Sequence, residues 1–241
     1  MKLFQWSCTH LLAAGLFFLS SCGGDGEKKA ETDTTAAETP PAPVSTIDTT
    51  SHNMVTIMHK VADFNKWMQA YEAHDSVRLA SGLHNYVIGR GLMDTNMVLI
   101  GLRADDFAKA KAFSQSPGLK ETMKKAGVTG APEVQYTVVT WQDTANVGSI
   151  PRVMTMFTVK DKEVWRASFE GGAPDRKAND IMIRNIGHDA DNPNGIRLVS
   201  ALGDTAKAMA YYNSDAMKKR FAEGGVIGQP KRFFFTIVKR Y

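Results

Sequence analysis

Hydrophobic and polar positions follow two alternating rhythms along the chain. Val55 to Val61 alternates as a strand does, and Phe64, Trp67, Met68 and Tyr71 then recur at the spacing of one helix face. This pattern predicts a strand followed by an amphipathic helix that packs its apolar face against a sheet.

The next segments continue with two strands, a second helix and a closing strand. Asp106 is placed to cap the second helix, Ser116-Pro117-Gly118 to break and restart it, and Gly127 to end it. The further predicted elements are the strands Asn85 to Leu92, Met97 to Arg103 and Val134 to Thr140, with a hairpin turn over Met93 to Asn96.

The same pattern occurs twice. When the chain is shifted by 98 residues, Val55 to Trp141 aligns without a gap on Val153 to Lys239, with 22 identities among 87 positions. We therefore expect two copies of one module, at 51–142 and 152–241, joined by a linker at 143–151.

The order strand, helix, strand, strand, helix, strand is typical of a ferredoxin-like α+β fold. Together with the helix ending Ser116 to Val128 and the equivalent prolines Pro132 and Pro230, it resembles the dimeric α/β-barrel superfamily, which includes the antibiotic-biosynthesis monooxygenases. The resemblance implies that the antiparallel sheets of the two repeats pack into one intramolecular α/β-barrel. It also implies a cavity between the sheets, which relatives use for oxygenation of aromatic substrates or for haem chemistry.

The N-terminus has the features of an export signal. Lys2 precedes an apolar run from Leu11 to Leu19, and Leu19-Ser20-Ser21-Cys22 resembles the bacterial lipobox. The resemblance implies removal of a signal peptide at 1–21, acylation of Cys22 with palmitate, and a membrane-anchored protein of the cell envelope. It places that protein at the outer membrane, facing the periplasm or the surface. The alternatives are an ordinary signal peptide and a short transmembrane anchor, but a spanning helix needs about 20 apolar residues.

Composition separates a tether from the folded part. Residues 22–50 are rich in Thr, Ala and Pro and carry a net charge of −4, so we expect a disordered acidic tether. The chain beyond Ser51 carries +7, which fits either an anionic partner or ordinary solvated helix faces. No nucleic-acid recognition motif is present. Cys22 is the only thiol left after signal removal, which excludes an intramolecular disulfide.

Two positions suggest a site in only one of the modules. His59 shares the sheet face of Val55 and Val61, and its equivalent in the second module is Phe157. Tyr136 likewise has Phe234 as its equivalent. Each is either a ligand-binding group at a cavity or a side chain that fills an aromatic position in the core. The two equivalent tryptophans at 67 and 165 are predicted to be core anchors.

Two positions carry a cationic or titratable residue in both modules. Arg78 and Arg176 are equivalent, and either form ion pairs near the end of the first helix or bind a carboxylate at a cavity mouth. Arg90 and His188 are also equivalent, and either face the cavity, where they would bind an anion, or lie in solvent.

The chain lacks the usual catalytic motifs. It has no histidine pair at metal-ligand spacing, no phosphate-binding glycine loop and no Gly-x-Ser-x-Gly turn. The haem-using relatives have an axial histidine on a helix that lines the cavity, but neither 106–126 nor 204–224 contains one. We therefore expect no cofactor and no metal.

The first functional hypothesis is a non-catalytic small-ligand-binding or scaffold module that takes an apolar or anionic ligand. The alternative is a cofactor-free monooxygenase-like enzyme acting in the cavity between the sheets. A third hypothesis is a subunit of an envelope assembly with a protein partner, motivated by the basic surface and the tether.

Overall fold

Residues 45–241, which the computed structural model describes, contain two successive halves with the same order of elements. The first module contains β2 (His52–Val61), α1 (Phe64–Ala73), α2 (Asp75–Ala80), β3 (Leu83–Gly91), β4 (Met97–Ala104), α3 (Phe107–Gln115), α4 (Pro117–Lys125) and β5 (Val128–Asp143). The second contains β6 (Arg152–Val159), α5 (Lys162–Gly171), α6 (Ala173–Ala178), β7 (Ile181–Asp189), β8 (Gly195–Leu202), α7 (Thr205–Asn213), α8 (Asp215–Glu223) and β9 (Val226–Arg240). The predicted α+β fold class is confirmed.

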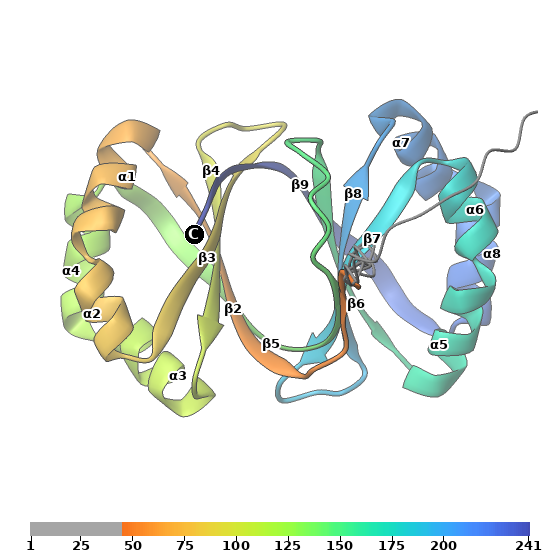
Figure 1. Ribbon diagram of the computed structural model, residues 1–241, viewed down its shortest axis with the longest axis horizontal. Helices are drawn as coiled ribbons and strands as arrows, with labels where there is room; N and C mark the ends of the chain where they lie inside the picture. The colour runs from red at the N-terminus through yellow and green to blue at the C-terminus, as the bar shows by residue number, and fades with distance from the viewer. Residues whose placement is uncertain (1–44) are drawn as a thin grey trace, which may run out of the picture. The chain divides into compact units, whose positions relative to one another are not determined.

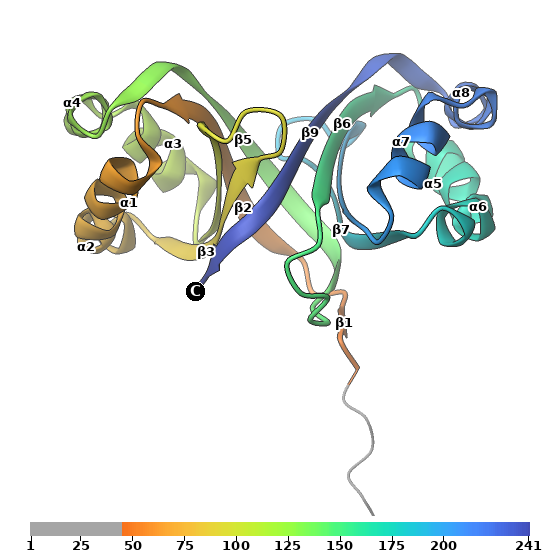
Figure 2. The ribbon, with the colours of Figure 1, turned by 90° about the horizontal axis from the view of Figure 1, so that it is seen from above.

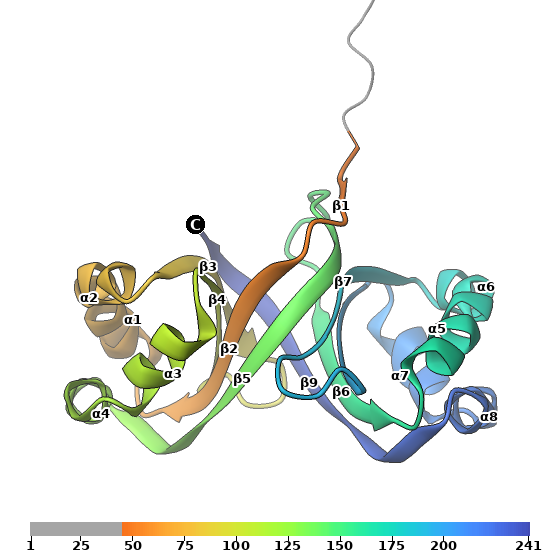
Figure 3. The ribbon, with the colours of Figure 1, turned by 90° about the horizontal axis from the view of Figure 1, so that it is seen from below.

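The strands form a closed ring. Within the modules the strand orders are β5-β2-β4-β3 and β9-β6-β8-β7, and all pairs are antiparallel. The pairings of β3 with β9 and of β5 with β7 join the two sheets at both edges. Figures 2 and 3 show the last strand of each module running into the sheet of the other. Neither sheet is left with a free edge strand, because each edge pairs with the other module.

The equivalent glycines Gly89 and Gly187 lie at these two junctions. A Cβ at Gly89 would stand 2.6 Å from the Phe235 ring, and a Cβ at Gly187 would stand 2.6 Å from the backbone oxygen of Val138. Both distances are far below van der Waals contact, so the strands approach this closely only because these positions carry no side chain. This explains why Gly occurs at both positions of the repeat.

The helices cover the outer faces of the ring. Figure 1 shows α1 to α4 against one sheet and α5 to α8 against the other. The first module therefore has a helix–sheet core around Trp67 and Tyr71, and the second has one around Trp165 and Tyr211. Trp67 and Trp165 are buried, as predicted for core anchors. A separate cluster inside the ring joins the two sheets, as described below.

Local capping signals account for many of the repeated residues. Asp106 accepts a hydrogen bond from the backbone nitrogen of Lys109 (2.8 Å), and Ser116 caps α4 through the nitrogen of Leu119 (3.3 Å). Asp204 and Ser214 cap α7 and α8 in the same way. The predicted helix break at Ser116 is therefore confirmed.

The closing strand begins earlier than predicted. β5 starts at Val128 rather than Val134, because the turn-forming residues Gly130 and Pro132 lie in a bulge. The register there passes from Met58 paired with Glu133 to Lys60 paired with Thr129, which leaves His59 opposite the bulge. The second module has the same irregularity between Met156 and Thr158.

The N-terminal part of the described chain also departs from the prediction. Ile47 and Asp48, which composition placed in the tether, form the short strand β1 (Ile47–Asp48) beside Asp143 and Gln142 of β5. Thr144 reinforces this pairing with a hydrogen bond to the Thr46 carbonyl. The predicted signal peptide, Cys22 and residues 23–44 lie outside the described residues. Within 45–241, none of the helices has both the length and the apolar character required to cross a bilayer.

Candidate functional site

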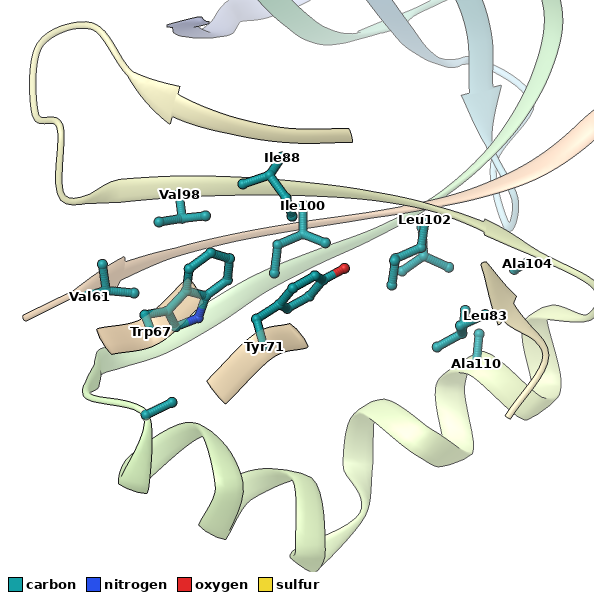
Figure 4. Packing of buried hydrophobic residues seen from close by; sticks show 12 residues of the cluster. Val61, Trp67, Tyr71, Leu83, Ile88, Val98, Ile100, Leu102, Ala104 and Ala110 are labelled. Atoms are coloured by element: carbon teal, nitrogen blue, oxygen red, sulfur yellow. The ribbon is translucent and has the colours of Figure 1, made fainter. Parts of the chain in front are cut away.

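A cavity of about 210 Å³ lies between the helices and the sheet of the first module. Its walls come from β2, β4 and β5 on one side and from α1, α3 and α4 on the other. Figure 4 shows Trp67 and Tyr71 of α1 facing Ile100 and Leu102 of β4 across this layer. We call it the helix–sheet cavity. An engineered apolar cavity of about 150 Å³ in another protein binds benzene, so this volume suffices for a compact apolar molecule.

His59 is a deeply buried titratable group in the wall of this cavity. Its side chain is 4% exposed, and neither ring nitrogen has a hydrogen-bond partner. Burial lowers the pKa of His59 to about 4, so the imidazole is neutral at pH 7. A neutral imidazole offers one N–H donor and one nitrogen acceptor. Both remain without a partner in the folded protein.

The sequence positions His59 through simple strand alternation. Val55, Ile57 and His59 of β2 share one sheet face, as predicted, and all three line the cavity on the helix side of the sheet. The bulge in β5 lies opposite His59 and brings Pro132 into the same wall. The His59 ring packs edge-on against Trp67, with centroids 5.6 Å apart at 66°. The site therefore rests on a strand and a helix rather than on a loop.

The second module provides an internal comparison. Phe157 takes the place of His59 and packs against Trp165 in almost the same geometry, with centroids 5.9 Å apart at 63°. The corresponding cavity measures only about 60 Å³. Larger side chains fill it: Phe221 and Arg220 stand where the first module has Met123 and Thr122. The cavity is therefore specific to the first module, and substitutions in α4 and α8 decide which module has it.

Arg78 also lines the helix–sheet cavity, but its hydrogen bonds point to a structural role. The buried guanidinium donates to the Tyr71 carbonyl (2.6 Å), to Asn85 (3.2 Å) and to Asp75 (3.2 Å). It also stacks on the Tyr71 ring, with its carbon 3.6 Å from the centroid. These contacts tie α1, α2 and β3 together at the rim of the cavity.

Arg176 repeats part of this arrangement. It donates to the Phe169 carbonyl (2.5 Å) and stacks on the Phe169 ring at 3.9 Å, as Arg78 does with Tyr71. Burial lowers the pKa of Arg176. The same contact in both modules supports a structural role for the pair, within the smaller cavity of the second module.

The other predicted site residues lie elsewhere. Arg90 donates to the Thr95 carbonyl (2.7 Å) in its own hairpin and stacks on Phe64. The hydroxyl of Tyr136 lies 2.8 Å from Ser114 Oγ, close to the helix–sheet cavity but outside its lining. His188 Nδ1 contacts the Asp189 carbonyl (2.9 Å) beside a separate surface hollow. Of the six candidates, only His59 and Arg78 meet at one cavity.

The six predicted site residues do not line a cavity between the sheets, where the sequence placed their site. Inside the ring, Met58, Leu99, Met154, Met156 and Phe235 are all buried in one apolar cluster. This cluster leaves a hollow of about 80 Å³, and none of the six predicted residues lines it. Long methionine and phenylalanine side chains from opposite sheets fill the space because they reach across it.

The sequence contained a signal for the real cavity that residue-by-residue inspection missed. Ala70, Thr122 and Met123 line the helix–sheet cavity, while the equivalent positions in the second module hold Ser168, Arg220 and Phe221. At each of these three helix positions the second module has a larger side chain than the first. Their combined effect on volume becomes visible only once the helices are placed on the sheet.

The helix–sheet cavity does not fit a haem. Sites for drug-sized ligands occupy about 300–1,000 Å³, whereas this cavity has about 210 Å³. Its helices α3 and α4 carry no histidine. Among residues 45–241, no three His, Cys, Asp or Glu side chains gather closely enough to hold a metal ion. The chemistry available in the cavity is therefore mainly apolar packing around the neutral imidazole of His59, with the polar side chains of His74, Arg78 and Lys120 also in its lining.

Comparisons with known proteins reveal similarity at the level of structure. No protein-family model matches the chain, and no curated protein matches its sequence significantly. An anthrone oxidase-like protein superposes with a TM-score of 0.52 and 13% identity, over 82% of this chain and 95% of its own. A Fusobacterium nucleatum protein assigned as a monooxygenase gives 0.50 and 12%, over 78% and 93%.

A third structure, of a protein assigned as a chlorite dismutase, gives a TM-score of 0.50 and 10% identity, over 78% of this chain and 95% of that one. At such identities the similarity concerns the fold, and it spans nearly the whole of each of these proteins. The chain thus shares its ferredoxin-like α+β fold with structures assigned to oxygenase and chlorite dismutase families.

Proposed function

We propose that this chain is a lipid-anchored protein of the cell envelope whose first module binds a small apolar ligand in the helix–sheet cavity. The observation that carries the proposal is the buried His59, which has no hydrogen-bond partner and lines a cavity of about 210 Å³. Burying a polar group without a partner costs about 1–3 kcal/mol. A ligand hydroxyl or carbonyl that reached His59 would recover part of that cost.

The cavity lining defines the ligand class. Most of the wall is formed by aliphatic and aromatic side chains, including Ile57, Trp67, Ile100 and Phe113, and the other basic side chains in it besides His59 are His74, Arg78 and Lys120. The ligand is therefore a compact, uncharged and largely apolar molecule that carries one hydrogen-bonding group. Arg78, the buried cation of the lining, already donates to Tyr71, Asn85 and Asp75, so a charged ligand would have to lose its hydration without gaining a free counter-ion beside His59.

Two probe molecules test this assignment by isothermal titration calorimetry on the purified full-length protein. p-Cresol fits the proposed class, and toluene has the same ring and methyl group without the hydroxyl. A hydrogen bond to His59 is worth about 1 kcal/mol, so we expect p-cresol to bind about fivefold more tightly than toluene. In His59→Phe this preference should disappear.

Two further variants separate binding in the cavity from binding elsewhere. Met123→Phe places in the first module the side chain that Phe221 provides in the second, and should weaken both probes at least about tenfold by filling the volume. Met93→Phe makes the same substitution at a side chain that is 92% exposed, and should leave binding unchanged. Equal affinities in all variants would contradict the proposal.

A second candidate function is oxygenation of the ligand in the same cavity. Similarity to an anthrone oxidase-like protein and to a protein assigned as a monooxygenase favours it. His59 is the group that would accept a proton from an acidic substrate, since its imidazole is neutral at pH 7. Oxygen consumption with anthrone that is lost in His59→Phe would establish this function, whereas binding without turnover would support a binding protein.

The anchor and the repeat belong to the same proposal. The lipobox-like Leu19 to Cys22 supports acylation, and palmitate labelling that is lost in Cys22→Ala would test it. The 22 identities and the common order of elements support an origin by tandem duplication of one module. Anchored in this way, the protein would present its cavity at the membrane surface on an acidic tether.

A further inference from the structure

A second, chemically distinct hollow lies inside the strand ring. It has a volume of about 80 Å³, and three arginines line it together with a single carboxylate: Arg152, Arg184, Arg240 and Asp143. The charged side chains of its lining therefore sum to +2. We call this region the arginine-lined end of the ring.

Arg152 is the least exposed of these groups. It is the first residue of β6 and only 2% exposed, yet no carboxylate of the described residues 45–241 lies within ion-pair distance of it. Its Nη1 donates to the Ile150 carbonyl (2.9 Å) and its Nη2 to the Gly148 carbonyl (3.3 Å). A guanidinium has five N–H groups, so these two bonds leave several donors unused.

The neighbouring cations make this burial more costly. Burial, together with the charges of Arg240 and Arg184, lowers the pKa of Arg152 to about 10, which still leaves it charged at pH 7. A buried charge without a counter-ion is strongly unfavourable. Arg152 therefore keeps its positive charge in the hollow although no carboxylate in 45–241 forms an ion pair with it.

The other two arginines are held differently. Arg184 is paired with Asp143 (2.6 Å) and also donates to the Asp143 carbonyl, so that carboxylate is already engaged. Arg240, the last residue of β9, is exposed, and its side chain makes no hydrogen bond or ion pair with any residue in 45–241. Arg152 and Arg240 both line the hollow, and within 45–241 neither has an anionic partner.

The floor of the hollow is apolar. Met54, Leu99 and Met154 close it from three strands, with Val199 beside them. The hollow of about 80 Å³ would hold fewer than three water molecules, since each occupies ~30 Å³ in the liquid. The space therefore suits an anionic head next to a very short hydrocarbon body.

We propose that the arginine-lined end of the ring binds a small organic carboxylate of two or three carbons. The carboxylate accepts hydrogen bonds from Arg152 and Arg240, and the carbon chain lies against Met54 and Met154. This site is separate from the helix–sheet cavity. Its ligand is charged, whereas the ligand proposed for His59 is uncharged.

Methionine methyl NMR on the purified full-length protein tests the site directly. Titration with propionate at constant ionic strength should shift the Met54 and Met154 methyl signals in a saturable manner. The Met93 methyl, which is 92% exposed, should not move. Arg240→Gln should raise the dissociation constant at least about fivefold, while Arg166→Gln, which removes an exposed arginine paired with Glu170, should leave it unchanged.

Arg240 is the better position to vary, because the Arg152 side chain holds the turn before β6 and its loss would also affect folding. Three outcomes would overturn the proposal: no saturable shift with propionate, saturation by phosphate but not by propionate, or an unchanged propionate affinity in Arg240→Gln. Each is independent of whether p-cresol binds beside His59, so the two sites can fail separately.

Discussion

His59 should make the stability of this protein sensitive to acid in a way that Phe157 does not. The ordinary pKa of histidine is about 6.5, and burial lowers that of His59 to about 4. Below pH 6.5 the unfolded chain therefore takes up a proton at His59 while the folded chain does not. The contribution of neutral His59 to the free energy of unfolding is fully present above about pH 6.5 and is lost as the pH falls toward 4.

The size of the effect follows from the shift. Each pKa unit corresponds to 1.36 kcal/mol, so the full shift represents about 3 kcal/mol, of which about 2 kcal/mol is lost between pH 7 and pH 4.5. Carboxylates also titrate in this range, but they are common to the wild-type protein and a His59 variant. The difference between the two proteins therefore isolates His59.

The perturbation is His59→Phe, and the second module shows that phenylalanine fits this geometry against tryptophan. At pH 7 we expect a gain of about 1 kcal/mol, because two buried ring nitrogens without partners are removed. At pH 4.5 the gain should rise by a further 2 kcal/mol or so. The reverse variant, Phe157→His, should lose stability at pH 7 and lose more at pH 4.5.

Urea unfolding of the three proteins at both pH values provides the measurement. For a chain of this size, 2 kcal/mol corresponds to a change in melting temperature of roughly 4–8 °C, so thermal unfolding can serve as a second readout. The reasoning is refuted if wild type and His59→Phe lose the same stability between pH 7 and 4.5. That result would mean that the ring nitrogens of His59 are solvated or paired in solution.

The other predictions concern the ring and the helix caps. Gly187→Ala should destabilise the protein by about 3 kcal/mol, because the added methyl group would meet the Val138 backbone oxygen. Gly89→Ala should cost less, because its methyl group would meet the Phe235 ring, which can turn. Equal losses of unfolding free energy in chemical denaturation would contradict this. Ser116→Ala should cost about 1 kcal/mol through loss of the α4 cap, and a change of under a few tenths in the unfolding free energy would argue against it. Arg184→Met should cost about 3 kcal/mol at pH 7 by leaving the partly buried Asp143 carboxylate without its cation, and the cost should shrink as acid protonates this carboxylate, whose pKa lies below its usual value.

Much of the architecture follows from local signals in the sequence. Alternation along β2 put His59 on the face of Val55 and Ile57, and that face does pack against the helices. Capping residues such as Asp106 and Ser116 set the helix boundaries, because a side-chain oxygen meets the free backbone N–H groups two or three residues ahead. Such signals can be read from a few neighbouring residues, whatever the rest of the chain does.

The predicted signal peptide and the acylation of Cys22 rest on the sequence alone, since they fall outside the described residues. The start of β5 was predicted too late because Gly130 and Pro132, which lie in a bulge within the strand, have the composition of a turn that precedes a strand. β1 was missed because two residues carry almost no pattern. Its pairing depends on Gln142 and Asp143, far away in the sequence.

What the tertiary structure decided is where space remains. The sequence placed the main cavity between the sheets, but side chains such as Met154 and Phe235 leave only about 80 Å³ inside the ring, and the larger volume of about 210 Å³ lies beside His59 on the helix side. The closure of the ring at Gly89 and the gathering of Arg152, Arg184 and Arg240 at one end were equally invisible in the sequence. Cavity volume and charge balance are sums over side chains from many strands and helices, so they are fixed only when the whole chain has brought those side chains together.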